Sequence, residues 1–267
     1  MNDYKFNEFV EIVKKLRQEC PWDREQTNDS IKAATIEEAY EVVEAIDKKD
    51  YEDLKKELGD LLLHVVFHTV IAGKTQNFNI GDVITSIKEK LIRRHPHVFG
   101  NTKVSGADEV KKNWEEIKLS EGRESILDGV PEMLPALQRA HRLQEKAAKV
   151  GFDWDKKEDV WKKVIEEIEE MHQVENKRQK KKEEDDFFNQ LEDEVGDVFF
   201  AMVNYARFLG INPENALRRT NKKFIKRFNY VEKMIIKSGR KLTESNLKEM
   251  DKFWEESKRS LKDQPDL

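Results

Sequence analysis

The sequence predicts an all-α protein made of two tandem helical bundles. Charged residues make up 39% of the 267 residues, while Gly and Pro number only 11 and 6, a composition typical of solvated helices and unusual for sheets. Apolar residues recur at helical spacing along most of the chain. One pattern of acidic residues also occurs twice, first within residues 37–60 and again within residues 166–197. Together these observations predict a duplicated helical domain.

The first half contains five apolar stripes with helical spacing. The expected helices are residues 6–16, Thr35–Ile46, Tyr51–Ala72, a segment between Asp82 and Pro96, and Asp108–Leu119. The turn around Pro21 ends the first helix. Thr35 and Glu38 match a capping box in the second helix, and Asp82 is expected to cap the fourth.

The second half repeats this order after a connection rich in turn residues. Gly129, Pro131 and Pro135 mark residues 122–135 as a linker between an N-terminal domain, 1–121, and a C-terminal domain, 136–267. The expected helices run from Pro135 to near Gly151, over Asp159–His172 and Phe187–Leu209, from Pro213 onward, and over Glu244–Leu261. The charged run Lys177–Asp186 lengthens the second half and is predicted to be a solvated loop.

Composition excludes several classes of protein. The net charge of −5 disfavours non-specific binding to a nucleic-acid backbone, so no nucleic-acid partner is expected. Cys20 is the only cysteine, which excludes an internal disulfide and a thiolate metal cluster. No apolar run reaches the roughly 18 residues of a membrane span, and the first residues lack the apolar core of a signal peptide. We therefore expect a cytoplasmic protein with no membrane partner.

The repeated acidic pattern predicts a metal site in each half. Residues three or four apart share one face of a helix, so each helix presents its acids in one direction. Acids that face one another across two antiparallel helices repel unless a cation lies between them. Ligands that offer only oxygen favour Mg²⁺, with Mn²⁺ as the other candidate. The candidate metal ligands are Glu38, Glu41, Glu57 and Asp60 in the first half and Glu167, Glu170, Glu194 and Asp197 in the second.

Other interpretations of this pattern stay open at the level of sequence. A single Glu-x-x-Glu is commonly no more than a solvated helix face. Gly59 and Gly196 directly precede the aspartates, although glycine within a helix costs about 1 kcal/mol relative to alanine. They indicate either close packing of helices or room for a ligand.

Two histidines offer an alternative metal chemistry in the first half. His64 and His68 share the helix face of the first acids, as in di-iron bundles that use Glu-x-x-His, so an iron site is a further candidate. Their counterparts in the second half are Ala201 and Tyr205. The duplicated site is therefore expected to use carboxylates alone, with the histidines in packing or supporting roles.

Cationic and aromatic residues follow the acids in both halves. The fork of arginine and the point charge of lysine suit phosphate oxygens, and tryptophan offers a plane for a base. With a metal they describe a site for a nucleotide polyphosphate, while surface ion pairs and core aromatics are the alternatives. The candidate substrate-binding residues are Lys90, Arg94, Trp114 and Lys118 in the first half and Lys223, Arg227, Trp254 and Lys258 in the second.

Nearly the whole chain resembles the MazG family. The stretches that resemble its N-terminal copy are Cys20–Asp23, Glu37–Glu41, Glu57–Asp60 and Arg93–Gly100, and those that resemble its C-terminal copy are Gly151–Asp155, Glu194–Asp197 and Asn221–Phe228. The resemblance implies an all-α, usually dimeric hydrolase that converts nucleoside triphosphates to monophosphates and pyrophosphate with Mg²⁺. It also implies that the acids named above hold the metal, and that the cationic and tryptophan residues contact the nucleotide.

The resemblance leads us to expect in-line attack of a water, activated by the cation, on the α-phosphorus. A carboxylate that is not a metal ligand would act as base, and Glu166 or Glu37 would position the water. Glu166, Glu194, Lys223 and Arg227 are the residues expected to take part in catalysis. The expected partners are nucleoside triphosphates and a second copy of the chain in a homodimer. The alternative function is a non-catalytic, nucleotide-sensing helical interaction module.

Overall fold

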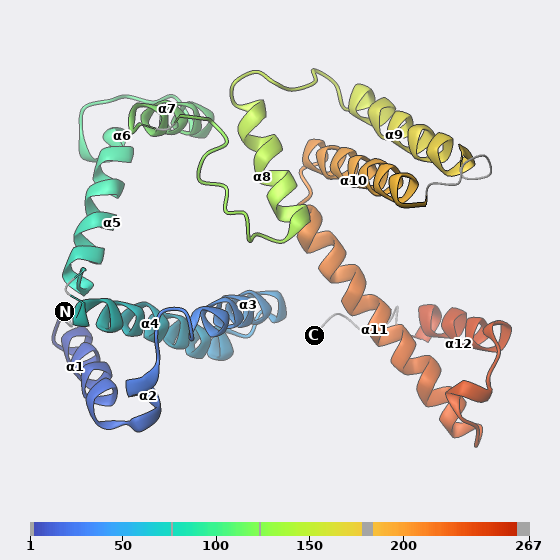
Figure 1. Cartoon of the computed structure of the whole chain (residues 1–267), viewed down its shortest axis with the longest axis horizontal. Helices are drawn as coiled ribbons and strands as arrows, with labels where there is room; N and C mark the ends of the chain where they lie inside the picture. The colour runs from blue at the N-terminus through green and yellow to red at the C-terminus, as the bar shows by residue number, and fades with distance from the viewer. Residues whose placement is uncertain (1–2, 76, 123, 178–183, 261–267) are drawn as a thin grey trace. The chain divides into compact units, whose positions relative to one another are not determined.

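The computed structural model describes residues 3–75, 77–122, 124–177 and 184–260, and the regular structure in these residues is helical without strands (Figure 1). The all-α fold class predicted from the sequence is confirmed. The first helices are α1 Asp3–Glu19, α2 Pro21–Glu25, α3 Lys32–Lys48, α4 Tyr51–Lys74, α5 Ile80–Arg94, α6 Pro96–Phe99 and α7 Ala107–Ser120. The later helices are α8 Ala136–Ala148, α9 Lys157–Lys177, α10 Glu184–Phe208, α11 Pro213–Lys237 and α12 Leu247–Ser260, with a 3₁₀ turn at Leu242–Glu244.

Contacts divide the chain into two compact units, with the division between Ser105 and Gly106. By this division α7 belongs to the second unit. The domain boundaries expected from the sequence, 1–121 and 136–267 around a linker, stay a prediction. In the part of the chain that the structure describes, no helix is long and apolar enough to cross a membrane.

The first unit is organised around α4. Val10 and Val13 of α1 pack with Val66 and Phe67 of α4 and with Ile31, which directly precedes α3. A two-residue connection of Lys49 and Asp50 then returns the chain from α3 to α4. Because this connection is so short, α3 and α4 run antiparallel and side by side (Figure 1). This arrangement turns the acids of both helices toward a shared face.

The α3–α4 connection shows how local chemistry produces that hairpin. Lys49 adopts a left-handed conformation with φ of 56°, which ends α3. The Asp50 carboxylate then accepts hydrogen bonds from the backbone N–H groups of Glu52 and Asp53 at 3.1 and 3.0 Å. These two donors have no partner within the helix, so Asp50 satisfies them and fixes the start of α4.

In the second unit, α9 and α10 form the corresponding pair, and α8 packs against α10. Val160 and Val164 of α9 are buried, as are Ala201 and Val203 of α10. The Gln144 side chain donates to the carbonyl of Phe200 at 2.8 Å and so ties α8 to α10.

A second helix pair, α11 and α12, completes this unit. Val231 and Ile235 of α11 and Ser257 of α12 are buried, and the two helices pack against each other. Asn212 caps α11 by accepting from the backbone of Asn215, and Pro213 occupies the first helical turn, as expected from the sequence.

The expected linker, residues 122–135, contains no helix among its described residues. Its course is held by Lys146 of α8, which is buried and donates to the carbonyls of Ile126 and Asp128 at 2.9 and 2.8 Å. Burying an ammonium group is costly unless its donors are satisfied, and the two carbonyls accept two of them. The segment is therefore tied to α8 within the second unit.

Two predicted helix caps are wrong. Thr35 lies inside α3, which begins three residues earlier, and its hydroxyl is 3.0 Å from the carbonyl of Ile31. The cap of α5 is Asn79, which accepts from the backbone of Asp82, while the Asp82 carboxylate accepts from the Asn79 backbone. Asp82 is the reciprocal member of this capping box, because the helix starts earlier than its apolar stripe.

The predicted solvated loop Lys177–Asp186 is only partly within the described residues. Helix α9 reaches Lys177 and α10 begins at Glu184, so both ends of the predicted loop are helical. Residues 178–183 lie outside the described part of the chain.

Replacing Asp50 by alanine should lower the free energy of unfolding by about 1 kcal/mol, because two backbone N–H donors at the start of α4 lose their acceptor. Urea unfolding followed by far-UV circular dichroism measures this change. Asp50→Asn keeps an acceptor oxygen and should remain close to the wild type. Equal stability of Asp50→Ala and the wild type would show that the cap does not stabilise α4.

Candidate metal centre

Each helix pair brings three carboxylates together. Oxygen atoms of Glu38, Glu41 and Glu57 lie within 4.8 Å of one another between α3 and α4. Glu167, Glu170 and Glu194 form the same arrangement between α9 and α10. Asp60 and Asp197, the fourth acid expected in each half, lie outside these groups of three.

The acids of the first group disfavour one another's charge. The pKa of Glu38 is raised chiefly by burial and then by the charges of Glu41 and Asp60, so Asp60 still acts on the group electrostatically. The pKa of Glu57 is raised by burial and by the charge and hydrogen bond of Glu41. Concentrated negative charge of this kind favours a bound cation.

The carboxylates of the second group also disfavour one another's charge, and a lysine lies beside them. A hydrogen bond to Glu167, followed by burial and the charge of that residue, raises the pKa of Glu170. Lys163 lies one turn earlier on α9, with its Nζ 2.6 Å from Glu166 and 2.8 Å from Glu167. These two bonds raise the pKa of Lys163. Lys163 is not among the site residues predicted from the sequence, although its spacing of three and four residues from Glu166 and Glu167 is a signal for such a contact.

The donor set fits a hard divalent cation. Each group offers carboxylate oxygens and, in the described residues, no sulfur or imidazole ligand. Oxygen donors suit Mg²⁺ and Mn²⁺, whereas an iron centre of the Glu-x-x-His type needs a histidine within the group.

The glycines beside these acids have open surroundings. Among the described residues, and apart from the backbone of its own helix, a Cβ atom on Gly59 or Gly196 would meet no atom within 4 Å. Close packing of helices within the described part of the chain therefore does not explain either glycine, and room beside the acids is the interpretation that stays.

The two histidines lie beside the first group and form a polar array with Thr35. The Thr35 Oγ1 is 2.9 Å from Nδ1 of His64 and 2.8 Å from Nε2 of His68. The other nitrogen of His68 is 2.9 Å from Oδ1 of Asn28, and burial lowers the pKa of His68. The Nε2 of His64 is 3.8 Å from Glu38, which is too long for a hydrogen bond. This array supports the helix pair next to the acids, and that contact explains why Thr35 is not a cap.

The candidate nucleotide contacts of the second unit cluster between α11 and α12. The guanidinium carbon of Arg227 lies 5.8 Å from the ring centre of Trp254, within cation–π range. Phe224 packs against the same tryptophan with ring centres 5.3 Å apart. Lys258, one turn after Trp254, forms an ion pair with Glu255. These contacts lie within the α11–α12 pair, whereas the acids lie on α9 and α10.

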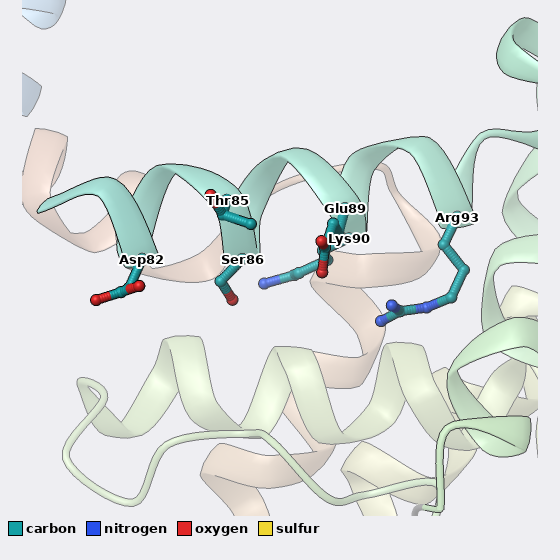
Figure 2. Close-up of a pocket in the computed structure, with 6 residues that line it drawn as sticks. All are labelled: Asp82, Thr85, Ser86, Glu89, Lys90 and Arg93. Carbon is teal, nitrogen blue, oxygen red and sulfur yellow. The ribbon is translucent and has the colours of Figure 1, made fainter. Parts of the chain in front are cut away.

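The corresponding residues of the first half are divided between the two units. Lys90 and Arg94 lie on α5, and Trp114 and Lys118 on α7, where the lysine is 4.6 Å from the tryptophan ring centre. Figure 2 shows a hollow along α5 that is lined by Asp82, Thr85, Ser86, Glu89, Lys90 and Arg93. Because one helix supplies all its lining residues, the hollow is part of a helix surface and offers cationic groups at one end.

A further link was not expected from the sequence. Arg207 of α10 donates to Asp153 at 2.5 Å and to Asn204 at 2.9 Å. Asp153 belongs to the motif Gly151–Asp155, and the bond holds this motif against the end of α10. Only the tertiary contact identifies this partner, since the two residues lie 54 positions apart.

A family model matches this chain twice. The model is described as the MazG nucleotide pyrophosphohydrolase domain, and it matches residues 26–99 and 156–232. The chain belongs to the MazG family. The two matched segments include both groups of acids, together with Lys223 and Arg227, and they end before Trp114 and Trp254 respectively.

Relatives of this MazG chain match over nearly its full length. It is 43% identical to a protein of Thermotoga maritima named nucleoside triphosphate pyrophosphohydrolase/pyrophosphatase MazG, covering 95% of each chain. It is 41% identical to the nucleoside triphosphate pyrophosphohydrolase of Escherichia coli K12, covering 96% of this chain and 97% of that one. A crystal structure of a mazG-related protein from Thermotoga maritima aligns with 42% of this chain and 98% of its own, at 27% identity and a TM-score of 0.39.

Without metal, Glu57→Gln should raise the melting temperature near neutral pH by roughly 2 °C, because it removes one charge from the first group. A raised pKa means that the folded state favours protonated Glu57, so stability falls as the pH rises from 4.5 through the raised value. The advantage of the variant should therefore shrink as the pH approaches 4.5. Thermal unfolding in EDTA across this range measures both effects.

Glu52→Gln is the matched control, because Glu52 lies on the same helix but is exposed and paired with Lys55. It should not raise the melting temperature. A Glu57→Gln variant that is destabilised equally at every pH would contradict the repulsion inferred here.

Proposed function

We propose that this MazG protein hydrolyses ribo- and deoxyribonucleoside triphosphates to the monophosphate and pyrophosphate, as part of nucleotide-pool housekeeping. The observation that carries the proposal is the convergence of three carboxylates between two helices, in both segments that match the MazG domain. The names of the relatives from Thermotoga maritima and Escherichia coli support the reaction.

Mg²⁺ is the cation we propose for these sites, with Mn²⁺ as a substitute. The residues that would hold it are Glu38, Glu41, Glu57 and Asp60 in the first unit and Glu167, Glu170, Glu194 and Asp197 in the second. When bound, such a cation lowers the pKa of a water and offsets the charge of the triphosphate. Asp60 and Asp197 are the proposed ligands that lie outside the groups of three.

A carboxylate of the chain is proposed to accept the proton that the attacking water loses. In the proposed reaction the oxygen of water attacks the α-phosphorus in line, and the bond from that phosphorus to the bridging oxygen breaks. Pyrophosphate leaves with the bonding electron pair. A carboxylate that is not a metal ligand is proposed to accept the proton of the water, and Glu166 or Glu37 is proposed to orient that water. Both side chains are exposed beside a ligand of the proposed site.

The cationic residues are proposed to bind the phosphates and base. Lys223 and Arg227 lie one turn apart on α11, where an ammonium and a guanidinium can bind the oxygens of the leaving pyrophosphate. Trp254 presents a ring beside Arg227 and is proposed to stack on the base. Lys258 follows on α12 as a further cation.

A homodimer is part of this proposal. Phe199, Phe200 and Met202 follow the acidic motif on α10, and all three side chains are exposed. Monomeric proteins rarely leave several large apolar side chains together on their surface. A second copy of the chain is the proposed cover for this face of α10.

Product analysis tests the reaction and identifies the working half. ³¹P NMR of nucleoside triphosphates incubated with the protein and Mg²⁺ should show monophosphate and pyrophosphate. Glu57→Gln and Glu194→Gln, measured separately, should show which site acts, with turnover reduced by at least about a hundredfold in the variant of the working site. Diphosphate and inorganic phosphate would contradict attack at the α-phosphorus. Nucleotide binding without turnover would favour the nucleotide-sensing module.

Trp254→Ala should raise KM by about tenfold and change kcat little, because stacking on a base is worth roughly 1–3 kcal/mol and does not involve the reacting bond. Trp254→Phe keeps a ring and the packing against Phe224, so it should recover much of the affinity. Trp22→Ala removes an exposed tryptophan of the first unit and is the control. A fall in kcat at unchanged KM would contradict a role for Trp254 in base binding.

A further inference from the structure

Lys163 distinguishes the second group of acids from the first. Its ammonium nitrogen is 2.6 Å from an oxygen of Glu166 and 2.8 Å from an oxygen of Glu167. The Glu167 side chain is 10% exposed and that of Lys163 is 36% exposed, so water screens this pair only in part. Glu167, a proposed metal ligand, and its neighbour Glu166 are thus already paired with the positive charge of Lys163.

The first group has no lysine at the equivalent position. When Glu38 is placed on Glu167, Lys163 corresponds to Ala34, which is partly buried on α3. The group near Glu38 is instead the imidazole of His64, at 3.8 Å. The acids are duplicated, but the charge next to them is not.

This lysine keeps its charge under ordinary conditions. Lysine side chains are protonated at neutral pH, since their ordinary pKa is about 10.4, and the ammonium of Lys163 is held by the carboxylates of Glu166 and Glu167. A divalent cation that approaches Glu167 meets this charge at short range. It must either displace the ammonium from the carboxylate or bind next to it against repulsion.

We infer that Lys163 is a resident competitor for the divalent cation at the second site, so that the two sites of the chain load at different metal concentrations. This inference rests on the metal sites of the proposed function. The first site loads at lower metal concentration, and the second site loads only when the cation is concentrated enough to overcome Lys163. The lysine acts on metal binding through Glu167 and Glu166, and it is a positioning residue in this role.

Metal affinity of each site, measured on the full chain without nucleotide, tests the inference. Glu57→Gln disables the first site and leaves the second, while Glu194→Gln does the reverse. Mn²⁺ titration followed by electron paramagnetic resonance reports the free ion and gives the dissociation constant of the site that remains. Circular dichroism confirms that each variant has the helix content of the wild type.

Two reciprocal changes carry the test. Lys163→Met keeps the apolar stem and removes the charge, and in the Glu57→Gln chain it should tighten Mn²⁺ binding by about tenfold, the size expected for one nearby charge in a partly hydrated site. Lys163→Arg keeps the charge and should bind as weakly as lysine. Ala34→Lys, in the Glu194→Gln chain, should weaken the first site by about tenfold.

Lys162→Met is the matched control. Lys162 directly precedes Lys163 on α9, but it pairs with Asp159 at 2.8 Å and not with the glutamates of the proposed metal site. It should leave the dissociation constant unchanged. Weaker or unchanged Mn²⁺ binding in Lys163→Met, or no Mn²⁺ binding to the wild type, would overturn the inference. Failure of the proposed hydrolysis is a separate result, since it appears as missing or different phosphorus products and not as a changed Mn²⁺ affinity.

Discussion

Mutual repulsion of carboxylates held between two packed helices is the constraint around which each unit is built. Glu38, Glu41 and Glu57 would separate in a flexible chain, because water and distance would relieve their repulsion. Packing against α4 and the short turn at Lys49 and Asp50 prevent that separation. The apolar contacts of the helices therefore stabilise an arrangement of charge that is unfavourable until a cation is bound, and stability and metal binding are thermodynamically linked.

The duplication preserved this arrangement while its surroundings diverged. In the first unit Thr35, His64 and His68 form a polar array beside the acids. In the second unit Lys163 binds the acids directly, and a tyrosine takes the position of the second histidine, where its ring packs on Trp161. Two sites with the same ligands thus differ in the charge next to them, which is the property that sets cation affinity and basicity.

Periodicity predicted the helices well because each amphipathic face is a local property. Helices α3 and α4 start and end within a few residues of their predicted bounds, and the all-α class and MazG membership are confirmed. The errors fall where a side chain had two possible partners. Thr35 looked like a cap, but its hydroxyl contacts histidines of α4. Asp82 looked like a cap, but its carboxylate accepts a hydrogen bond from the backbone of Asn79, which is the cap. For Thr35 a contact with another helix decided the role, and for Asp82 the helix began before the apolar pattern that marks it.

The sequence by itself determined the fold class, the duplication and the helix faces on which the acids lie, because these depend on spacing of three and four residues. The contact of Lys163 with Glu166 and Glu167 also follows from spacing of this kind. Only the tertiary structure decided which carboxylate oxygens meet, that Asp60 and Asp197 lie outside the groups of three, and that Arg227 lies beside Trp254. The physical reason is that these distances join segments far apart in the chain, and they depend on how the side chains of two helices interlock rather than on the pattern of either one.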